Sequence, residues 1–256
     1  MSYTIDERNP ERQRLLAEML NPTTREVLAR LPRIPDRKVL DLGCGQGNTT
    51  RTLAEALEPA ICVGLEYDPS LVEYAETRAD NPRCVQFQQG DATQLSFEDA
   101  SVDVVFCRYL LIHMTDTVRV VQEMLRVVRP GFAIAHEADF IVEFSDPPCD
   151  ALKSLNKLWN GLFQNPCAGQ KLVRYFRESG GGDVQAGAVV QLEHNAALMK
   201  RVYRLTAEAI GPLGESRGVL TANEVREMVE GLTRLEKDPE NVLVKFPDVW
   251  IIARRS

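Results

Sequence analysis

Acidic side chains stand at the ends of three short apolar runs in this sequence, and the first of them adjoins a glycine-rich turn. Asp41 opens D-L-G-C-G-Q-G, Glu66 ends the run 61–66, and Asp91 follows the run 85–89. Carboxylates accept hydrogen bonds from hydroxyl and amino groups and favour positively charged ligands. Because glycine tolerates φ > 0 and lets the backbone approach a ligand closely, the turn suits a binding loop. These residues predict a site for a ligand that carries hydroxyls and positive charge.

Candidate bases follow two further runs. His113 comes after residues 102–108, while His136 and Glu137 come after residues 132–135. An imidazole with an ordinary pKa accepts a proton near neutral pH. Side chains alternate along a strand, so we expect Glu137 to face the site and His136 to be buried and hydrogen-bonded. His113 is equally compatible with a packed position in L-L-I-H-M.

Three acids, Glu137, Asp139 and Glu143, lie close together in this part of the chain. One hypothesis is that they hold an acceptor with positive character, such as an amine, by charge-assisted hydrogen bonds. The alternative is a solvated loop in which Asp139 caps a helix.

The elements that position these residues read as an α/β fold. Short apolar runs predict strands at 39–42, 61–66, 85–89, 102–108 and 132–135, and helical stripes predict helices at 49–57, from Asp68-Pro69 and at 117–129, the last ended by Pro130-Gly131. Ligands of open parallel sheets lie beyond the carboxyl ends of the strands. The acids and histidines should therefore meet at one edge of the sheet.

The flanking segments are predicted to be mostly helical. Residues 7–31 read as two helices, Glu11–Leu20 and a second one opened by Asn21 and Pro22. Later elements are a helix opened by Asp146-Pro147, a helix at 170–179, a strand at 184–192, helices within 195–240 that include a capping box at Thr221–Glu224, and a final strand at 242–253.

Composition excludes several classes of function. The net charge of −7 argues against a nucleic-acid surface, and the basic residues Arg8, Arg12 and Arg14 are interpreted as solvated helix faces. The six cysteines show neither a C-x-x-C pair nor zinc-ligand spacing, so we expect no metal. We expect them to be reduced thiols in a cytoplasmic protein. The apolar runs are too short to cross a membrane, and residues 1–10 lack the apolar core of a signal peptide.

The motifs D-L-G-C-G-Q-G, G-L-E-Y-D-P-S, G-D-A and L-R-V-V-R-P-G together resemble the class I S-adenosylmethionine-dependent methyltransferases of the UbiE-like, type 11 kind. The resemblance is dense over residues 36–140. It implies a Rossmann-like α/β fold whose seven-stranded sheet has the order 3-2-1-4-5-7-6, with strand 7 antiparallel. A helical N-terminal lead-in and a helical lid would flank this sheet.

The resemblance also implies S-adenosyl-L-methionine as the cofactor and assigns residues to it by motif position. The ribose falls to Glu66 with its neighbour Tyr67, and the adenine to Asp91 and Ala92. The methionine part would be bound by the glycine loop and its surroundings: Asp41, Gly43, Cys44, Gly45 and the main chain of Arg108. Tyr3, near the N-terminus, would close over it.

On this basis we expect a single methyltransferase domain with an N-terminal cap at 1–35, a cofactor-binding half at 36–140, helical lid insertions at 141–240 and a final strand at 241–256. The expected reaction is methyl transfer to oxygen, nitrogen or carbon of a small molecule, an amine or a natural product, in secondary or specialised metabolism. Alternatives are a reaction without methyl transfer, such as cyclisation, and a peptide or protein methyltransferase. We expect a cytoplasmic monomer or homodimer.

Overall fold

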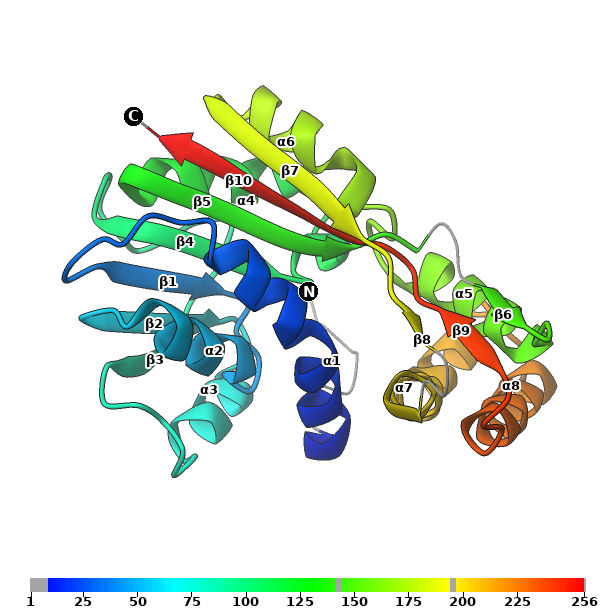
Figure 1. Ribbon diagram of the computed structural model, residues 1–256. Coiled ribbons are helices and arrows are strands. Elements are labelled where there is room, and N and C mark those ends of the chain that lie inside the picture. The colour runs from blue at the N-terminus through cyan, green and yellow to red at the C-terminus, as the bar shows by residue number, and fades with distance from the viewer. Residues whose placement is uncertain (1–8, 141–143, 194–196, 256) are drawn as a thin grey trace.

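A seven-stranded sheet forms the centre of the protein, in a computed structural model that describes residues 9–140, 144–193 and 197–255. Its strands are β1 (Lys38–Leu42), β2 (Ile61–Glu66), β3 (Val85–Gln89), β4 (Val102–Arg108), β5 (Val128–Ala138), β7 (Asp183–Val189) and β10 (Asp248–Arg255). The strand order is β3-β2-β1-β4-β5-β10-β7 (Figure 1). Strands β1 to β5 are parallel, and β10 is antiparallel to both neighbours. The predicted order and its reversed strand are confirmed.

Helices cover both faces of this sheet. They are α1 (Pro10–Leu28), α2 (Asn48–Leu57), α3 (Pro69–Glu76), α4 (Thr117–Val127) and α6 (Leu172–Glu178), with short 3-10 turns η1 (Leu111–His113) and η2 (Gly169–Lys171). Local capping explains where two of them begin, because Asp68 accepts from the N–H of Ser70 at 2.8 Å and Asp116 from that of Arg119 at 3.0 Å. The predicted N-cap at Asp68 is confirmed.

A smaller, mostly helical part lies beyond the carboxyl ends of the parallel strands (Figure 1). It contains α5 (Asp150–Leu162), α7 (Ala197–Ser216), α8 (Ala222–Glu236) and a three-stranded antiparallel sheet of β6 (Phe144–Asp146), β9 (Val242–Val244) and β8 (Leu192–Glu193). The predicted capping box opens α8, because Thr221 and Glu224 each accept from the other's backbone N–H. We call α5, α7 and α8 the lid helices.

The first helix differs from its prediction, because α1 is one continuous helix through Pro22 rather than two. Proline removes one helical N–H and would break a packed helix. Here Pro22 lies on the exposed face, where water can bond the carbonyl of Glu18 that loses its partner, while Thr23 and Thr24 on the opposite side are buried. Burial of that side therefore keeps the helix continuous.

Two strand predictions also need correction. β5 begins at Val128, so Pro130-Gly131 lie inside the strand instead of ending the helix before it. The pairing of β5 with β4 shifts register there, and an irregularity of this kind accommodates proline in a sheet. The final strand is split into β9 and β10, because the chain changes sheets at residues 245–247 and Pro247 has no N–H for a ladder.

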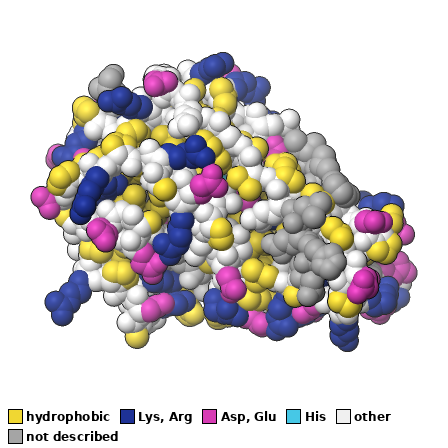
Figure 2. Space-filling model, in the orientation of Figure 1, with side chains coloured by type: hydrophobic (Ala, Val, Ile, Leu, Met, Phe, Trp, Pro, Cys, Tyr) yellow, Lys and Arg dark blue, Asp and Glu magenta, His cyan; other side chains and the backbone are white. Residues whose placement is uncertain are grey.

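The surface carries interspersed charges of both signs on the face shown in Figure 2. Among the described helices, none is long and apolar enough to cross a membrane.

Candidate active site

The glycine loop follows β1 and turns back beneath the end of β2. The N–H groups of Gly43 and Cys44 both donate to the carbonyl of Leu65, at 2.8 and 3.1 Å. Gly43 has φ +68°, and a Cβ there would lie 2.8 Å from the side chain of Leu110. Gly45, at φ +52°, is also in the left-handed region that favours glycine. Backbone conformation and close packing therefore both require glycine in this loop.

Asp41 is buried beside the loop and holds one oxygen without a partner. Its Oδ2 accepts from the Thr50 hydroxyl at 2.7 Å, while Oδ1 has no hydrogen-bond partner among the described residues. Burial raises the pKa of Asp41 to about 7, against the effects of Thr50 and of the Arg108 charge. A buried acceptor in this position fits a ligand group that donates hydrogen bonds or carries positive charge.

Glu66 ends β2 and lies against the same loop. Its Oε2 accepts from the N–H of Gly45 at 3.0 Å, and its Oε1 accepts from the N–H groups of Tyr67 and Asp68 at 2.7 and 3.1 Å. These bonds fix the carboxylate, and because Oε1 already accepts two of them, it is Oε2 that retains acceptor capacity. The side chain of Tyr67 is exposed beside it. Glu66 could thus accept from the hydroxyls of a ligand at the loop.

Asp91 and Ala92 follow β3 and adjoin Glu66 through the backbone, where Gly90 N–H donates to the Glu66 carbonyl at 2.9 Å. Asp91 is exposed, and its Oδ1 accepts from the N–H and the hydroxyl of Thr93 at 2.8 and 2.7 Å. This geometry is an ordinary Asp turn, which holds the carboxylate at the sheet edge. The structure therefore gathers Asp41, Glu66 and Asp91 at that edge, as the sequence predicted.

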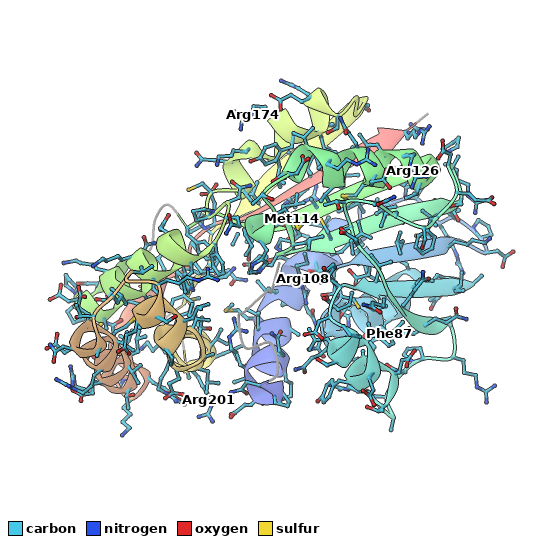
Figure 3. All side chains as sticks on the ribbon, turned by 180° about the vertical axis from the view of Figure 1, so that it is seen from behind. Phe87, Arg108, Met114, Arg126, Arg174 and Arg201 are labelled. Carbon is cyan, nitrogen blue, oxygen red and sulfur yellow. The ribbon has the colours of Figure 1, made fainter. Side chains whose placement is uncertain are left out.

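Arg108 contributes its side chain to the site as well as its main chain. Its Nη1 donates to Asn21 Oδ1 at 2.9 Å and to the Thr24 hydroxyl at 3.1 Å, both on α1. Burial lowers the pKa of Arg108, and the nearby Asp41 opposes this shift. Figure 3 places Arg108 at the ends of the central strands, next to α1. The predicted Tyr3 lies outside the described residues.

The structure corrects the prediction that Glu137 faces an acceptor. Glu137 is fully buried, and its carboxylate accepts from the N–H groups of Leu110, Leu111 and Ile112 at 2.9, 2.8 and 3.3 Å. It therefore fixes the turn η1, whose first N–H groups would otherwise lack partners. Burial raises the pKa of Glu137 to about 8, opposed by these three N–H donors.

The other acids do not form the predicted amine site either. Asp139 is buried and accepts from the N–H of Gln170 at 2.5 Å, and Glu143 lies outside the described residues. Asp139 therefore has a buried structural role. It neither binds an amine nor lies in a solvated loop, the two alternatives considered from the sequence. Among the described residues there is also no cluster of three or more His, Cys, Asp or Glu that could hold a metal ion.

His136 is buried beneath α1 and hydrogen-bonded, as expected from the alternation along its strand, so it does not serve as a base at a pocket wall. Its Nδ1 lies 3.2 Å from the Thr24 hydroxyl, and its Nε2 lies 3.7 Å from Asp248 Oδ1. Burial lowers the pKa of His136, and Asp248 opposes this shift. Asp248 also accepts from the Tyr109 hydroxyl and from the ammonium of Lys245. His136 therefore belongs to a buried polar cluster of Tyr109, His136, Lys245 and Asp248.

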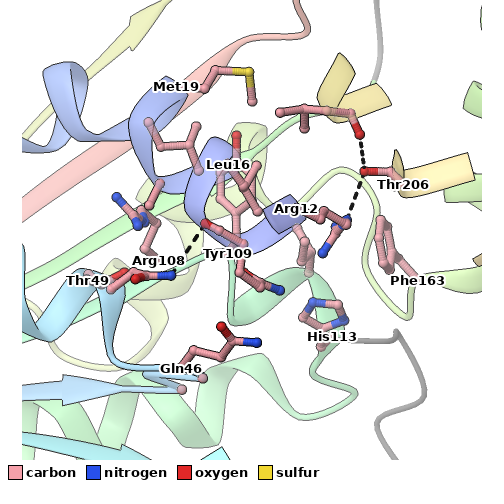
Figure 4. Close-up of a pocket in the computed structure, with 18 of the residues that line it drawn as sticks. Arg12, Leu16, Met19, Gln46, Thr49, Arg108, Tyr109, His113, Phe163 and Thr206 are labelled. Carbon is pink, nitrogen blue, oxygen red and sulfur yellow. Dashed lines mark hydrogen bonds between the residues drawn. The ribbon is translucent and has the colours of Figure 1, made fainter. Parts of the chain in front are cut away.

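A cavity connects the glycine loop to the lid helices, and His113 lines it (Figure 4). The ring of His113 packs edge-on against Phe163, with 5.0 Å between centroids. Burial and the charge of Arg12 lower the pKa of His113 to about 4, so the ring is neutral at pH 7. The neutral ring is a weak base, and its packing against Phe163 agrees with the packed position that the sequence left open for His113.

Aromatic rings line the cavity between the loop and the lid helices. Phe140 stacks on Trp159 with centroids 4.8 Å apart and meets Phe246 edge-on at 4.6 Å. Trp159 meets Tyr203 edge-on at 5.3 Å. We call the part of the cavity bounded by these rings the aromatic chamber: Tyr109, Phe140, Trp159, Phe163, Tyr203 and Phe246. Such a wall suits a flat apolar ligand.

Sequence reasoning missed one residue of this cavity, Arg12, and the backbone conformation of another, Tyr109. Arg12, interpreted as part of a solvated face, is 8% exposed, and its Nε donates to the Thr206 hydroxyl of α7 at 3.0 Å. Tyr109, directly after β4, has φ +54°, a rare conformation for an aromatic residue. Arg201 of α7 also pairs with Glu11 of α1 at 2.5 Å. The opposite charges of Glu11 and Arg201 in two predicted helices could have indicated their ion pair. No local pattern indicates the hydrogen bond of Arg12 with Thr206.

Comparisons with known proteins agree with this geometry. Residues 40–135 match the family model described as a methyltransferase domain. The chain is 31% identical to an O-methyltransferase of Pyrenophora dematioidea over 70% of its own length and 66% of that protein. It is 31% identical to the O-methyltransferase resE of Aspergillus sclerotiorum, over 70% of its own length and 67% of the relative. Thus the alignments leave about a third of each relative unmatched.

The fold has relatives among solved structures. The YcgJ protein of Bacillus subtilis aligns with 93% of this chain and 100% of its own, at 20% identity and a TM-score of 0.58. That likeness concerns the fold alone, and it extends to the part of the chain that follows residue 135.

Proposed function

Because this chain belongs to the class I S-adenosylmethionine-dependent methyltransferases, we propose that it transfers a methyl group from S-adenosylmethionine to a small molecule bound in the aromatic chamber. The observation that carries the proposal is a cavity lined both by Gly43–Gln46 of the glycine loop and by rings of the lid helices. A donor on the loop would face an acceptor among the rings. The relatives named O-methyltransferases favour an oxygen acceptor.

The residues at the sheet edge fit the proposed cofactor. The unpartnered Oδ1 of Asp41 suits the methionine ammonium, and Glu66 suits the ribose hydroxyls. Asp91 with Ala92 would border the adenine. The bound cofactor would supply an electrophilic methyl group on a sulfonium. The other residues that the sequence assigned to the cofactor would complete its site: Tyr3, Gly43, Cys44, Gly45, Tyr67 and Arg108.

The chain's own contribution would be alignment and exclusion of water. Holding two reactants in an attack geometry can lower a barrier by about 7–11 kcal/mol. The contacts Arg12–Thr206 and Arg201–Glu11 tie α1 to α7 across the chamber, so both reactants would be enclosed by α1 and the lid helices. A closed, aromatic chamber also keeps water from competing as a nucleophile.

We also infer a cytoplasmic monomer or homodimer that acts on a natural-product-like small molecule without nucleic acid or membrane partners. Support comes from the cysteines, which are all free, because a reducing compartment keeps thiols in that state. A mass measurement in solution would decide between one and two copies.

Calorimetric titration with S-adenosylmethionine and S-adenosylhomocysteine tests the proposal. We expect the wild-type protein to bind both ligands. The Glu66→Gln variant should bind them at least about tenfold more weakly, because charge-assisted hydrogen bonds contribute about 1.5–3 kcal/mol. The control Glu73→Gln alters an exposed acid of α3 and should bind like wild type. Absence of wild-type binding, or equal binding by Glu66→Gln, would contradict the cofactor site. With an acceptor, release of S-adenosylhomocysteine separates methyl transfer from cyclisation.

A further inference from the structure

One ring of the aromatic chamber comes from the part of the chain that lies against the glycine loop. Tyr109 directly follows Arg108, whose charge interacts with that of Asp41 at the end of β1. It directly precedes Leu110, whose side chain leaves no room for a Cβ at Gly43. The other five rings of the chamber come from later in the chain, between residues 140 and 246. Tyr109 therefore stands where the loop side of the cavity meets the chamber.

The backbone of Tyr109 is held in a conformation that turns the chain out of β4. Its φ of +54° is unfavourable for an aromatic residue and persists only where the surroundings hold it. The N–H of Tyr109 donates to the His136 carbonyl at 2.9 Å, which fixes the turn from the β5 side. In Figure 4 Tyr109 lies between Thr49 on one side of the cavity and Phe163 on the other.

The hydroxyl end of the Tyr109 ring is anchored in the buried polar cluster. It donates to the carboxylate of Asp248, which is 0% exposed and also accepts from the ammonium of Lys245. Burial and the charge of Asp248 raise the pKa of Tyr109, so the ring stays a neutral phenol at pH 7. Donation to a carboxylate polarises the phenol and strengthens the negative potential of the ring faces. The ring is therefore both held in place and rich in electrons.

The wall of the cavity offers a cation no carboxylate. The described residues that line it include no Asp or Glu, and both of its arginines bond to helices. Arg12 donates to Thr206 of α7, and Arg108 donates to Asn21 of α1. A sulfonium has no N–H or O–H to donate to the amide and hydroxyl oxygens of the wall. In this respect it resembles a quaternary ammonium, a kind of cation that proteins recognise with aromatic faces.

On the premise of the function proposed above, we propose that Tyr109 supplies the aromatic contact for the sulfonium of S-adenosylmethionine. The site would thereby prefer the charged cofactor over its neutral product, S-adenosylhomocysteine. When the methyl group moves to the acceptor, the electron pair of the broken carbon–sulfur bond stays on sulfur and leaves a neutral thioether. The attraction to the ring is then lost, which favours exchange of the product for fresh cofactor.

Calorimetric titration of the full-length protein with both cofactor forms tests the proposal through the ratio of the two dissociation constants. Tyr109→Leu should reduce the preference for S-adenosylmethionine over S-adenosylhomocysteine about tenfold, because only the first ligand carries the sulfonium charge. A loss of packing alone would weaken both ligands equally and leave the ratio unchanged. The matched control Phe163→Leu removes a ring on the lid side of the same cavity and should also leave the ratio unchanged.

A second series of variants preserves the shape of the ring. Starting from Tyr109→Phe, fluorine atoms added to the ring one at a time withdraw electron density from its faces and change its size little. Affinity for S-adenosylmethionine should fall with each fluorine, by about tenfold in all, while affinity for S-adenosylhomocysteine stays constant. The proposal is overturned if Tyr109→Leu keeps the wild-type ratio, if Phe163→Leu changes it as much, or if fluorination weakens both ligands alike. Failure of the wild-type protein to bind either ligand would instead refute the proposed function, and this contact with it.

Discussion

Removal of Lys245 from the buried polar cluster should strongly destabilise the protein. The side chains of Lys245 and Asp248 are both 0% exposed, and the ammonium donates directly to the Asp248 carboxylate. In Lys245→Met the carboxylate keeps the Tyr109 hydroxyl but loses its cation. Breaking a buried ion pair from one side costs about 3–5 kcal/mol. That is a large share of the roughly 5–15 kcal/mol that stabilises a typical domain.

Urea unfolding, followed by the fluorescence of Trp159 and Trp250, measures this cost. The matched control is Lys153→Met, which breaks the exposed pair of Lys153 with Asp150, also three residues apart, and should leave the midpoint unchanged. The double variant Lys245→Met/Asp248→Asn removes the uncompensated charge and should recover much of the loss. A cost below about 1 kcal/mol for Lys245→Met would refute the reasoning, as would a double variant no more stable than the single one.

The pH dependence of this pair has a defined sign. Lys245 and His136 hold the pKa of Asp248 far below its usual range, despite burial. A depressed pKa contributes stability that is present above the unfolded value of about 3.9 and is lost as pH falls toward the folded value. The Lys245→Met variant should therefore lose less stability on acidification than wild type does.

Two further predictions concern the loop and the buried acid. Gly47→Ala should lower the free energy of unfolding by clearly more than the roughly 1–2 kcal/mol of a left-handed conformation, because a Cβ there would lie 2.5 Å from the Phe87 ring. The control Gly218→Ala, at φ +69°, places its Cβ where nothing lies within 4 Å. Equal urea midpoints for the two variants would contradict this. Glu137 has a pKa raised to about 8 by burial, so wild type should lose stability relative to Glu137→Gln as pH rises from about 4.3 toward that value. Parallel stability profiles of the two proteins across this range would contradict a raised pKa.

Much of the fold could be predicted because local signals agree with the tertiary structure. The strands 61–66, 85–89 and 102–108 were predicted to the residue, since each is a short run bounded by turn residues. Asp68 before Pro69 and the Thr221–Glu224 box mark helix starts for reasons confined to four residues. The glycines of the loop were predictable from the local sequence, but the contacts of the loop with Leu65, Glu66 and Leu110 were not, because those residues are distant in sequence.

The acceptor side of the site could not be predicted, because its residues depend on contacts between distant segments. Arg12 is buried where α1 packs against α7, whose Thr206 accepts from it and stands 194 residues later in the sequence. Alternation along β5 does place His136 and Glu137 on opposite faces, but it does not reveal that the N–H groups of residues 110–112 engage Glu137. Likewise, no local pattern shows that Pro22 lies on the exposed face of α1.

The insertion of β10 between β5 and β7 has a consequence for the order in which the protein is made. In the described sheet β7 pairs with β10 alone, so residues 183–189 have no partner until residues 248–255 have left the ribosome. During that interval β5 also exposes one unpaired edge. Unpaired edges recruit other chains. Nascent chains stalled before residue 248 should therefore be the species that chaperones bind and that aggregate, whereas completed chains should close the sheet and escape both fates.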